Sequence, residues 1–413
     1  MERVYDMNKI GTFIKIKRLE KDYSISTLSK DICSSSTLSK IENNQMITNE
    51  EVLNQLLKRL GIVDVSVIID NSKKVEELTN TFWTQLRLNI VDDIIYKQME
   101  ESKTLYDNSF YIISYYLMKL YKYSNIYNTV EITPCDEIIG KLDKIIELGN
   151  YTEQYFYTLY RISHSDSVSS NLELLSTWCS KDIYGIMKYT LADYYFHQGQ
   201  YYEAIRLMEE TYQQASKEGN LHLMYESTLT IVNSYLNVLG IHEIVQTYVQ
   251  RLMNLSNFLS EEKKYHIYYN IGSTLLQQKK YKQAYTYLSL LHGKQMKTDI
   301  LNFLLHHKLV YLYIELNDEN HFEKSMYSLK ELNKSFKGDR KKLCNAIIRS
   351  LEIKYNDKEY LDNDEYQKLI EYIYQHAQDV FMHGLKKFYS SDMEEVYKKQ
   401  RKYKELYLMY TNQ

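Results

Sequence analysis

The stretch from Ser35 to Lys40 holds five side chains suited to binding a polyanion. They are four short hydroxyls and one ammonium group: Ser35, Ser36, Thr37, Ser39 and Lys40. A hydroxyl both donates and accepts hydrogen bonds, and a lysine donates to phosphate oxygens. None of the five is large and apolar, so together they suit a surface that enters the major groove of DNA.

Two short helices joined by a tight turn would position this surface. Ser24 and Ser34 are each placed to cap a helix, because a serine hydroxyl accepts an unpaired N–H of the first turn. The apolar residues then fall at helical spacing, with Leu28 and Ile32 on the first helix and Leu38 and Ile41 on the second. Two further helices are expected around this pair, one at 8–22 and one that starts at Thr48, where Thr48 and Glu51 form a capping box, and ends at Gly61. Together they complete a compact bundle of four or five helices near residue 70.

The segment LSKDICSSSTLSKIENN resembles the helix-turn-helix of the phage-repressor-like (XRE) class, in the version carried by Rgg/PlcR-type (RRNPP) peptide-sensing regulators. The resemblance implies DNA binding, to which we also assign Lys17, and a buried ion pair between Arg18 and Glu42. The sequence departs from the family at two positions, where Ile25 replaces a glutamine and Asn44 a glycine. A helix-turn-helix that contacts only protein stays open as an alternative.

Composition predicts an all-α protein of more than one domain. The 413 residues include one proline and twelve glycines, which favours long helices over a sandwich or barrel, and Ser124–Cys135 around that proline is expected to be irregular. We expect a helix-turn-helix domain at 1–70, a polar linker at 71–77, and helical repeats at 78–413. Residues 9–40 hold seven Lys or Arg against three acidic residues, a modest basic patch that points to DNA binding as a homodimer.

No pattern in the sequence indicates catalysis, a metal site or a cofactor. The four cysteines are far apart, and the phosphate-loop, HExxH and GxSxG patterns are absent. The adjacent His306 and His307 fall on different faces of a helix, which favours a surface role over metal binding. Because these patterns are absent, we expect that the protein is not an enzyme. The N-terminus is polar and no apolar run nears bilayer length, so we also expect a cytoplasmic protein with no membrane partner.

An internal repeat of about 40 residues runs through the second half of the chain. Its markers are Tyr201-x-x-Ala204, Ile241-x-x-Ile244, Tyr281-x-x-Ala284 and Phe322-x-x-Ser325, with Ala192, Val232, Gly272 and Tyr313 twelve residues before each second member. A small residue on each helix of a hairpin allows close packing, and the pattern resembles the tetratricopeptide repeat. The second and fourth repeats fit less well, because Val232 and Tyr313 are not small. The resulting fold prediction is an N-terminal helix-turn-helix bundle followed by a tetratricopeptide-like α-solenoid.

Stacked hairpins of this kind form a concave groove. In Rgg/PlcR-type regulators asparagines on the groove-lining helices hold the backbone of an extended signalling peptide, and an amide group can donate and accept at once. The resemblance therefore makes six residues the peptide-binding candidates: Asn233, Asn237, Tyr269, Asn270, Tyr189 and Gln277. For each of these residues, a role in peptide binding and a position in the groove that contacts only solvent are equally compatible with the sequence.

These observations predict a DNA-binding transcription regulator that is controlled by a small quorum-sensing peptide. Two alternatives stay open. In one, the solenoid binds a protein partner instead of a peptide. In the other, the protein is an adaptor whose N-terminal bundle does not meet DNA.

Overall fold

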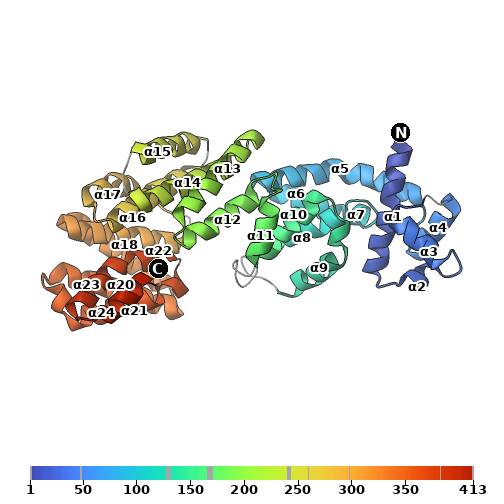
Figure 1. The fold of residues 1–413 in the computed structure, drawn as a ribbon. Helices are drawn as coiled ribbons and strands as arrows, with labels where there is room; N and C mark the ends of the chain where they lie inside the picture. The colour runs from blue at the N-terminus through green and yellow to red at the C-terminus, as the bar shows by residue number, and fades with distance from the viewer. Residues whose placement is uncertain are drawn as a thin grey trace. The chain divides into compact units, whose positions relative to one another are not determined.

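The computed structural model describes residues 2–46, 49–126, 132–164, 171–239, 243–258, 260–296, 298–381 and 383–411. Within these ranges every regular element is a helix, and twenty-four are α-helices (Figure 1). The prediction of an all-α protein is confirmed. The chain forms two compact units, Met1–Lys181 and Asp182–Gln413. None of the described helices has the length and apolarity needed to cross a membrane.

Four helices at the start of the first unit enclose a small apolar core: α1 (Glu2–Glu20), α2 (Ile25–Ser29), α3 (Ser35–Glu42) and α4 (Glu50–Arg59). Phe13, Leu28 and Leu38 are among its buried side chains. Gly11 sets the approach of α1 to α3, because a Cβ there would lie 2.0 Å from the Ile41 carbonyl oxygen. The helix expected from Thr48 begins at Glu50 with Asn49 as its cap, and Thr48 lies outside the described residues.

A long helix, α5 (Val65–Leu88), follows this bundle and is itself unbroken over its whole length. It includes residues 71–77, which we expected to be a linker. Ser72 and Val75 are buried there, so this polar segment is the exposed face of a packed helix, and the two compact units divide after Lys181 instead. The expected linker at 71–77 was therefore wrong.

Six further helices complete the first unit: α6 (Asp93–Glu101), α7 (Lys103–Asp107), α8 (Ile112–Ile126), α9 (Ile132–Ile145), α10 (Tyr151–Ser163) and α11 (Leu172–Cys179). Of the segment expected to be irregular at Ser124–Cys135, the described residues are helical at both ends: α8 extends to Ile126 and Pro134 lies in the first turn of α9, while residues 127–131 lie outside the described residues. Proline is tolerated there, since the first N–H groups of a helix have no intrahelical partner.

The four-helix bundle is fixed to the rest of this unit by polar and aromatic contacts. The Tyr116 hydroxyl donates to Glu20 Oε1 at 2.6 Å, and Lys144 pairs with Asp22 at 2.6 Å. The rings of Phe13 and Phe110 meet edge to face, with centroids 6.3 Å apart. The orientation of α3 is thus coupled to α8 and α9.

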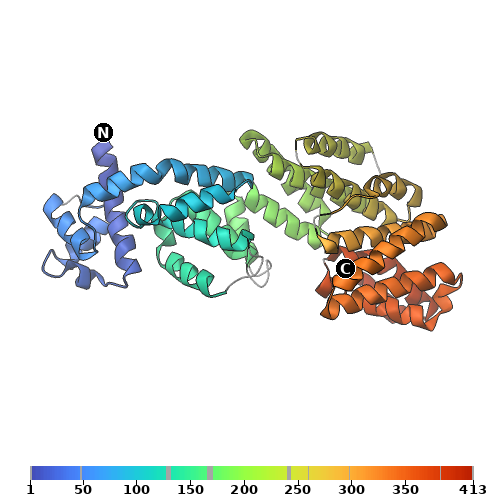
Figure 2. The same cartoon turned by 180° about the vertical axis from the view of Figure 1, so that it is seen from behind.

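The second unit is a succession of antiparallel helix pairs, which Figures 1 and 2 show stacked from α12 to α19. The pairs are α12 (Ile186–His197) with α13 (Tyr201–Glu218), α14 (Leu221–Leu239) with α15 (Glu243–Ser256), α16 (Glu261–Gln277) with α17 (Tyr281–Leu288), and α18 (Asp299–Leu316) with α19 (Glu319–Ser335). The remaining helices are α20 (Gly338–Asn356), α21 (Asp364–Val380), α22 (His383–Phe388), α23 (Ser390–Lys399) and α24 (Tyr403–Thr411).

The repeat positions lie where these helix pairs pack. Ala192, Ala204 and Ala284 are fully buried, and a Cβ on Gly272 would lie only 2.5 Å from Leu288 Cγ. Small residues therefore allow α16 and α17 to approach closely. The second repeat departs from this pattern, since Ile244 is 37% exposed and Ile241 lies outside the described residues.

Candidate functional sites

The α3 surface, which we define as Ser35, Ser36, Thr37, Ser39 and Lys40, rests on two capped helices. The Ser24 hydroxyl accepts the Thr27 N–H and the Ser34 hydroxyl accepts the Thr37 N–H, each at 3.0 Å. These bonds satisfy N–H groups that would otherwise be unpaired at the starts of α2 and α3. Just beyond α3, Asn44 adopts a left-handed conformation with φ 55°, which asparagine tolerates better than most residues.

A buried ion pair holds α3 against α1. Arg18 Nε lies 2.7 Å from Glu42 Oε1, and Arg18 Nη2 lies 2.8 Å from Oε2. The third guanidinium nitrogen donates to the Tyr23 carbonyl oxygen at 2.9 Å. The two-point contact between planar groups fixes the direction of α3 as well as its distance from α1.

The candidate DNA-binding residues differ in how far they reach solvent. Ser35, Ser36 and Lys40 are exposed, whereas Thr37 and Ser39 are half-buried. Lys17 is not on this surface: its side chain is only 12% exposed, and its ammonium pairs with Glu20 at 2.8 Å. The first five share one helix, α3, whereas Lys17 comes from α1.

One cation beside α3 was not among the candidates. Lys15 Nζ lies 3.3 Å from Asn43 Oδ1, at the end of α3. Its place in the basic stretch 9–40 was the available signal, but the sequence does not show which lysines of α1 lie next to α3. Lys15 thereby adds positive charge at the C-terminal end of this surface.

The six candidate peptide-binding residues lie on alternate helices of the second unit. Tyr189 is on α12, Asn233 and Asn237 are on α14, and the other three, Tyr269, Asn270 and Gln277, are on α16. All six are half-buried, as side chains lining a groove would be. Asn237 and Gln277 occupy equivalent positions of successive repeats.

Two of the amide groups among these residues already donate hydrogen bonds to main-chain carbonyl oxygens of their own helices. Asn237 Nδ2 donates to the Asn233 carbonyl oxygen at 2.7 Å, and Asn270 Nδ2 donates to the His266 carbonyl oxygen at 2.9 Å. One N–H group of each of these two amides is thus used within its own helix. Asn233 Oδ1 is buried and accepts no hydrogen bond within the described part of the chain, which is costly unless a ligand donates to it.

One helix reaches these residues from far along the chain. Lys387 of α22 donates through its ammonium to Asn237 Oδ1 at 2.7 Å, and its main-chain carbonyl accepts from Gln277 Nε2 at 3.2 Å. Two of the six candidates are thus in contact with the same residue of α22.

The same helices carry carboxylates that pair with basic side chains, and phenols that stay protonated. Glu226 pairs with Lys263, and His222 lies 3.8 Å from Glu226; on α12, Asp193 lies 3.6 Å from His197. Burial raises the pKa of Asp193, which His197 opposes and Glu226 adds to. Burial also raises the pKa of Tyr269 to about 12, so this phenol keeps its proton and can donate at neutral pH.

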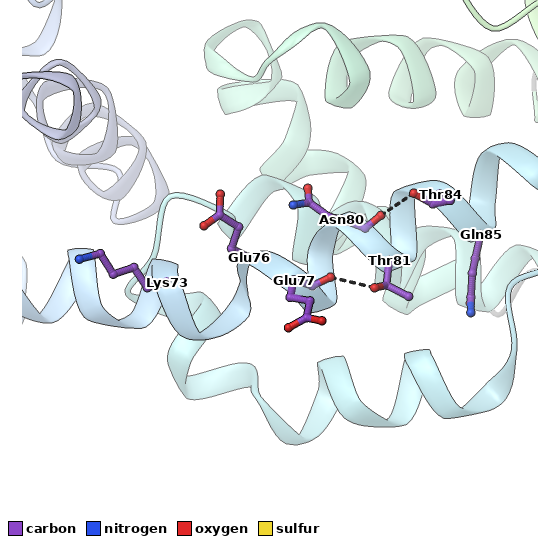
Figure 3. Close-up of a pocket in the computed structure, with 7 residues that line it drawn as sticks. All are labelled: Lys73, Glu76, Glu77, Asn80, Thr81, Thr84 and Gln85. Atoms are coloured by element: carbon purple, nitrogen blue, oxygen red, sulfur yellow. Dashed lines mark hydrogen bonds between the residues drawn. The ribbon is translucent and has the colours of Figure 1, made fainter. Parts of the chain in front are cut away.

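Two hollows in the described surface lie elsewhere. Figure 3 shows one along α5, where all seven lining residues come from that single helix and the hydroxyls of Thr81 and Thr84 bond back to its own carbonyl oxygens at 2.9 Å. The other, about 660 Å³, lies between α13 and α15 and is lined by Tyr212, Gln246, Thr247, Gln250, Arg251, Asn254 and Leu255. Neither includes a peptide-binding candidate.

The surface role expected for the adjacent histidines is wrong for His307. This side chain is fully buried, and its Nε2 lies 2.9 Å from the Tyr389 hydroxyl. Burial lowers its pKa well below the usual value, so the ring is neutral and structural.

Within the described residues, no group of three or more His, Cys, Asp or Glu side chains could hold a metal ion.

Comparison with known proteins identifies the N-terminal element. The family described as Helix-turn-helix matches residues 14–68, which span part of α1, all of α2, α3 and α4, and the first residues of α5. Residues 14–68 are a helix-turn-helix domain. The α3 surface lies within the matched residues. Curated proteins give no match to the chain.

One solved structure shows that the chain shares a known fold. It is similar to the apo form of the quorum sensor NprR from Bacillus thuringiensis, with 17% identity over 82% of this chain and 99% of that chain and a TM-score of 0.58. A second similar structure is Bacillus thuringiensis PlcR in complex with the peptide PapR7 and DNA, with 18% identity over 69% of this chain and 96% of that chain and a TM-score of 0.22. A helix-turn-helix domain followed by helical repeats is thus the fold of this chain.

Proposed function

We propose that this chain is a DNA-binding transcription regulator controlled by a small signalling peptide bound to the repeats of the second unit. The observation that carries DNA binding is the α3 surface of the helix-turn-helix domain, where Ser35, Ser36 and Lys40 are exposed and none of the five side chains is large and apolar. The second helix of such a motif lies in the major groove with its N-terminal residues toward the bases.

Peptide control is supported by the fold shared with NprR and by the side chains of α12, α14 and α16. Six half-buried polar and aromatic residues line three successive repeats, and the side-chain oxygen of Asn233 is buried without a donor in the described part of the chain. An extended peptide has N–H groups at regular intervals that would satisfy such acceptors. The peptide would act by favouring one of two arrangements of the protein.

DNA binding would involve a homodimer in the cytoplasm, because one α3 surface carries little charge. The exposed side chains of α24, Tyr403 at 64%, Tyr407 at 67% and Tyr410 at 54%, follow helical spacing and favour this helix as the contact between copies. Light scattering of the wild type and of Tyr403→Lys/Tyr407→Lys tests this, with a monomer expected only for the variant. A wild type that is monomeric at micromolar concentration would refute it.

Fluorescence anisotropy on DNA from upstream of its own gene tests the function directly. Ser36→Glu should lower the affinity at least about 100-fold, because a carboxylate at the groove repels phosphates. Thr81→Glu, which adds the same charge on the exposed face of α5, is the matched control and should bind as the wild type does. Equal affinity of Ser36→Glu and wild type would exclude α3 as the recognition helix.

The peptide is tested in the same assay with small peptides extracted from spent medium of the host. A change in DNA affinity supports the sensor. If DNA binds and no extract changes the affinity, the solenoid serves another partner, such as a protein.

A further inference from the structure

We infer that the groove of the second unit contains a subsite for a cationic side chain, and that Lys387 of this chain occupies it when no peptide is bound. The inference rests on the proposed peptide-binding function and specifies its ligand, a peptide with a lysine or arginine at the matching position. We call Tyr201 and Asn237 the Lys387 subsite.

Two helices, α13 and α14, contribute to this subsite, and α22 supplies its occupant. The Lys387 ammonium donates to the Tyr201 hydroxyl and to Asn237 Oδ1, and it lies 4.9 Å from the centre of the Tyr201 ring. The Tyr201 ring packs in turn on Phe196, with centroids 5.7 Å apart. An aromatic face, a phenolic oxygen and an amide oxygen together form a receptor for an ammonium or guanidinium group.

The acceptor side of the subsite is fixed. Because Asn237 Nδ2 is bonded to the Asn233 carbonyl oxygen, its Oδ1 must point toward the cation.

Lys387 can leave the subsite without α22 undocking. Its neighbours Leu385 and Phe388 are each 4% exposed, and Phe388 packs edge to face on His307 and Tyr311 with centroids 5.3 and 5.0 Å away. Gln277 bonds to the main-chain carbonyl of Lys387, which stays with the helix. Only the flexible Lys387 side chain, itself half-buried, has to swing out for another cation to enter.

Occupation by Lys387 weakens peptide binding by competition. The apparent affinity of a ligand falls in proportion to the fraction of protein whose site is open, so removing the internal cation should raise the affinity of cationic peptides and leave others unchanged. Lys387→Ala empties the subsite, and Lys387→Met empties it while keeping the aliphatic part of the side chain on Tyr201.

Lys386 provides the matched control. It precedes Lys387 on α22, is half-buried as well, and lies over a different ring, that of Tyr374, at 5.3 Å. Lys386→Ala therefore removes the same charge from the same helix without opening the Lys387 subsite. Thermal unfolding of each full-length variant checks that the fold is kept.

The probes are synthetic heptapeptide pools in which one position is fixed as lysine, arginine, glutamate or norleucine and the others are randomised. We expect pools with a fixed lysine or arginine at one position to bind Lys387→Ala and Lys387→Met about ten-fold more tightly than wild type. Glutamate and norleucine pools should not change, and Lys386→Ala should behave as wild type. Adding Asn237→Leu to Lys387→Ala should abolish the gain.

Two other results would overturn the inference, each in its own way. If pools bind but Lys387→Ala brings no gain specific to cations, or Lys386→Ala brings the same gain, the subsite is refuted and the proposed peptide binding stands. If no pool binds wild type or any variant, the proposed peptide binding fails and the subsite with it.

Discussion

At the scale of single residues, two lysines of the helix-turn-helix domain should affect DNA binding differently. Lys40 is exposed on the α3 surface, whereas Lys17 is paired with Glu20 and only 12% exposed. Lys40→Ala should weaken binding to all sequences and reduce the slope of log K against log salt by about 0.9 for each phosphate that it no longer neutralises. Lys17→Ala should leave this slope unchanged. Anisotropy titrations at several salt concentrations measure both, and a smaller slope in Lys17→Ala alone would reverse the assignment.

The buried pair of Arg18 and Glu42 gives a prediction about stability. Removing one partner leaves the other charge buried and uncompensated, which costs about 3–5 kcal/mol, whereas an apolar replacement of both costs far less. Arg18→Met and Glu42→Leu should each accelerate hydrogen exchange of the α3 amides, and the double variant should restore much of the protection. A double variant no better protected than the singles would contradict this account.

Several of these residues were predictable because local rules govern them. The caps Ser24 and Ser34 and the buried Leu28 and Leu38 follow from spacing and helix chemistry alone. Lys387 does not, because it meets Asn237 across 150 positions of sequence and nothing local to α22 indicates that contact. His307 was assigned to the surface for a related reason: helical spacing separates the faces of two adjacent residues, but it does not say which face meets a neighbouring helix.

At the scale of the elements, glycine distinguishes a packed helix face from a free one. Gly272 lies against Leu288 Cγ, and Gly272→Ala should destabilise the second unit by about 1–3 kcal/mol through overpacking. A Cβ added to Gly140 in α9 would meet no atom within 4 Å, so Gly140→Ala should stabilise the first unit by about 0.5–1 kcal/mol. Thermal unfolding measures both. A neutral Gly272→Ala, with Leu288 shifting aside, would show that α16 and α17 are not tightly packed.

The helices of the repeats were easier to predict than their boundaries with the rest of the chain. Twelve-residue spacing between Ala192 and Ala204, and again between Gly272 and Ala284, indicates hairpins directly. The linker prediction at residues 71–77 was wrong because a polar run is equally compatible with a connection between domains and with the solvent-exposed face of a helix. Only the burial of Ser72 and Val75 distinguishes the two, and burial depends on α7 and α8, which lie later in the chain.

At the scale of the whole molecule, two compact units predict two unfolding transitions in calorimetry. Gly140→Ala should raise the melting temperature of the transition that belongs to Met1–Lys181, and Gly272→Ala should lower that of the other transition. The two variants therefore identify which transition belongs to which unit. A bound peptide should then raise only the transition of Asp182–Gln413, where all six candidates lie, and operator DNA only that of the first unit. A peptide that shifts only the first-unit transition would place its site outside the repeats.

The unbroken course of α5 has a consequence for how this protein tolerates change in length. Its 24 residues form a stiff rod about 36 Å long that leads from the helix-turn-helix domain into the rest of the first unit. One residue inserted in its middle would turn everything beyond it by about 100°, whereas seven would nearly restore the original phase. Length variation in α5 is therefore expected to come in steps of whole turns. Such steps preserve the rotation of the helix-turn-helix domain about the axis of this helix.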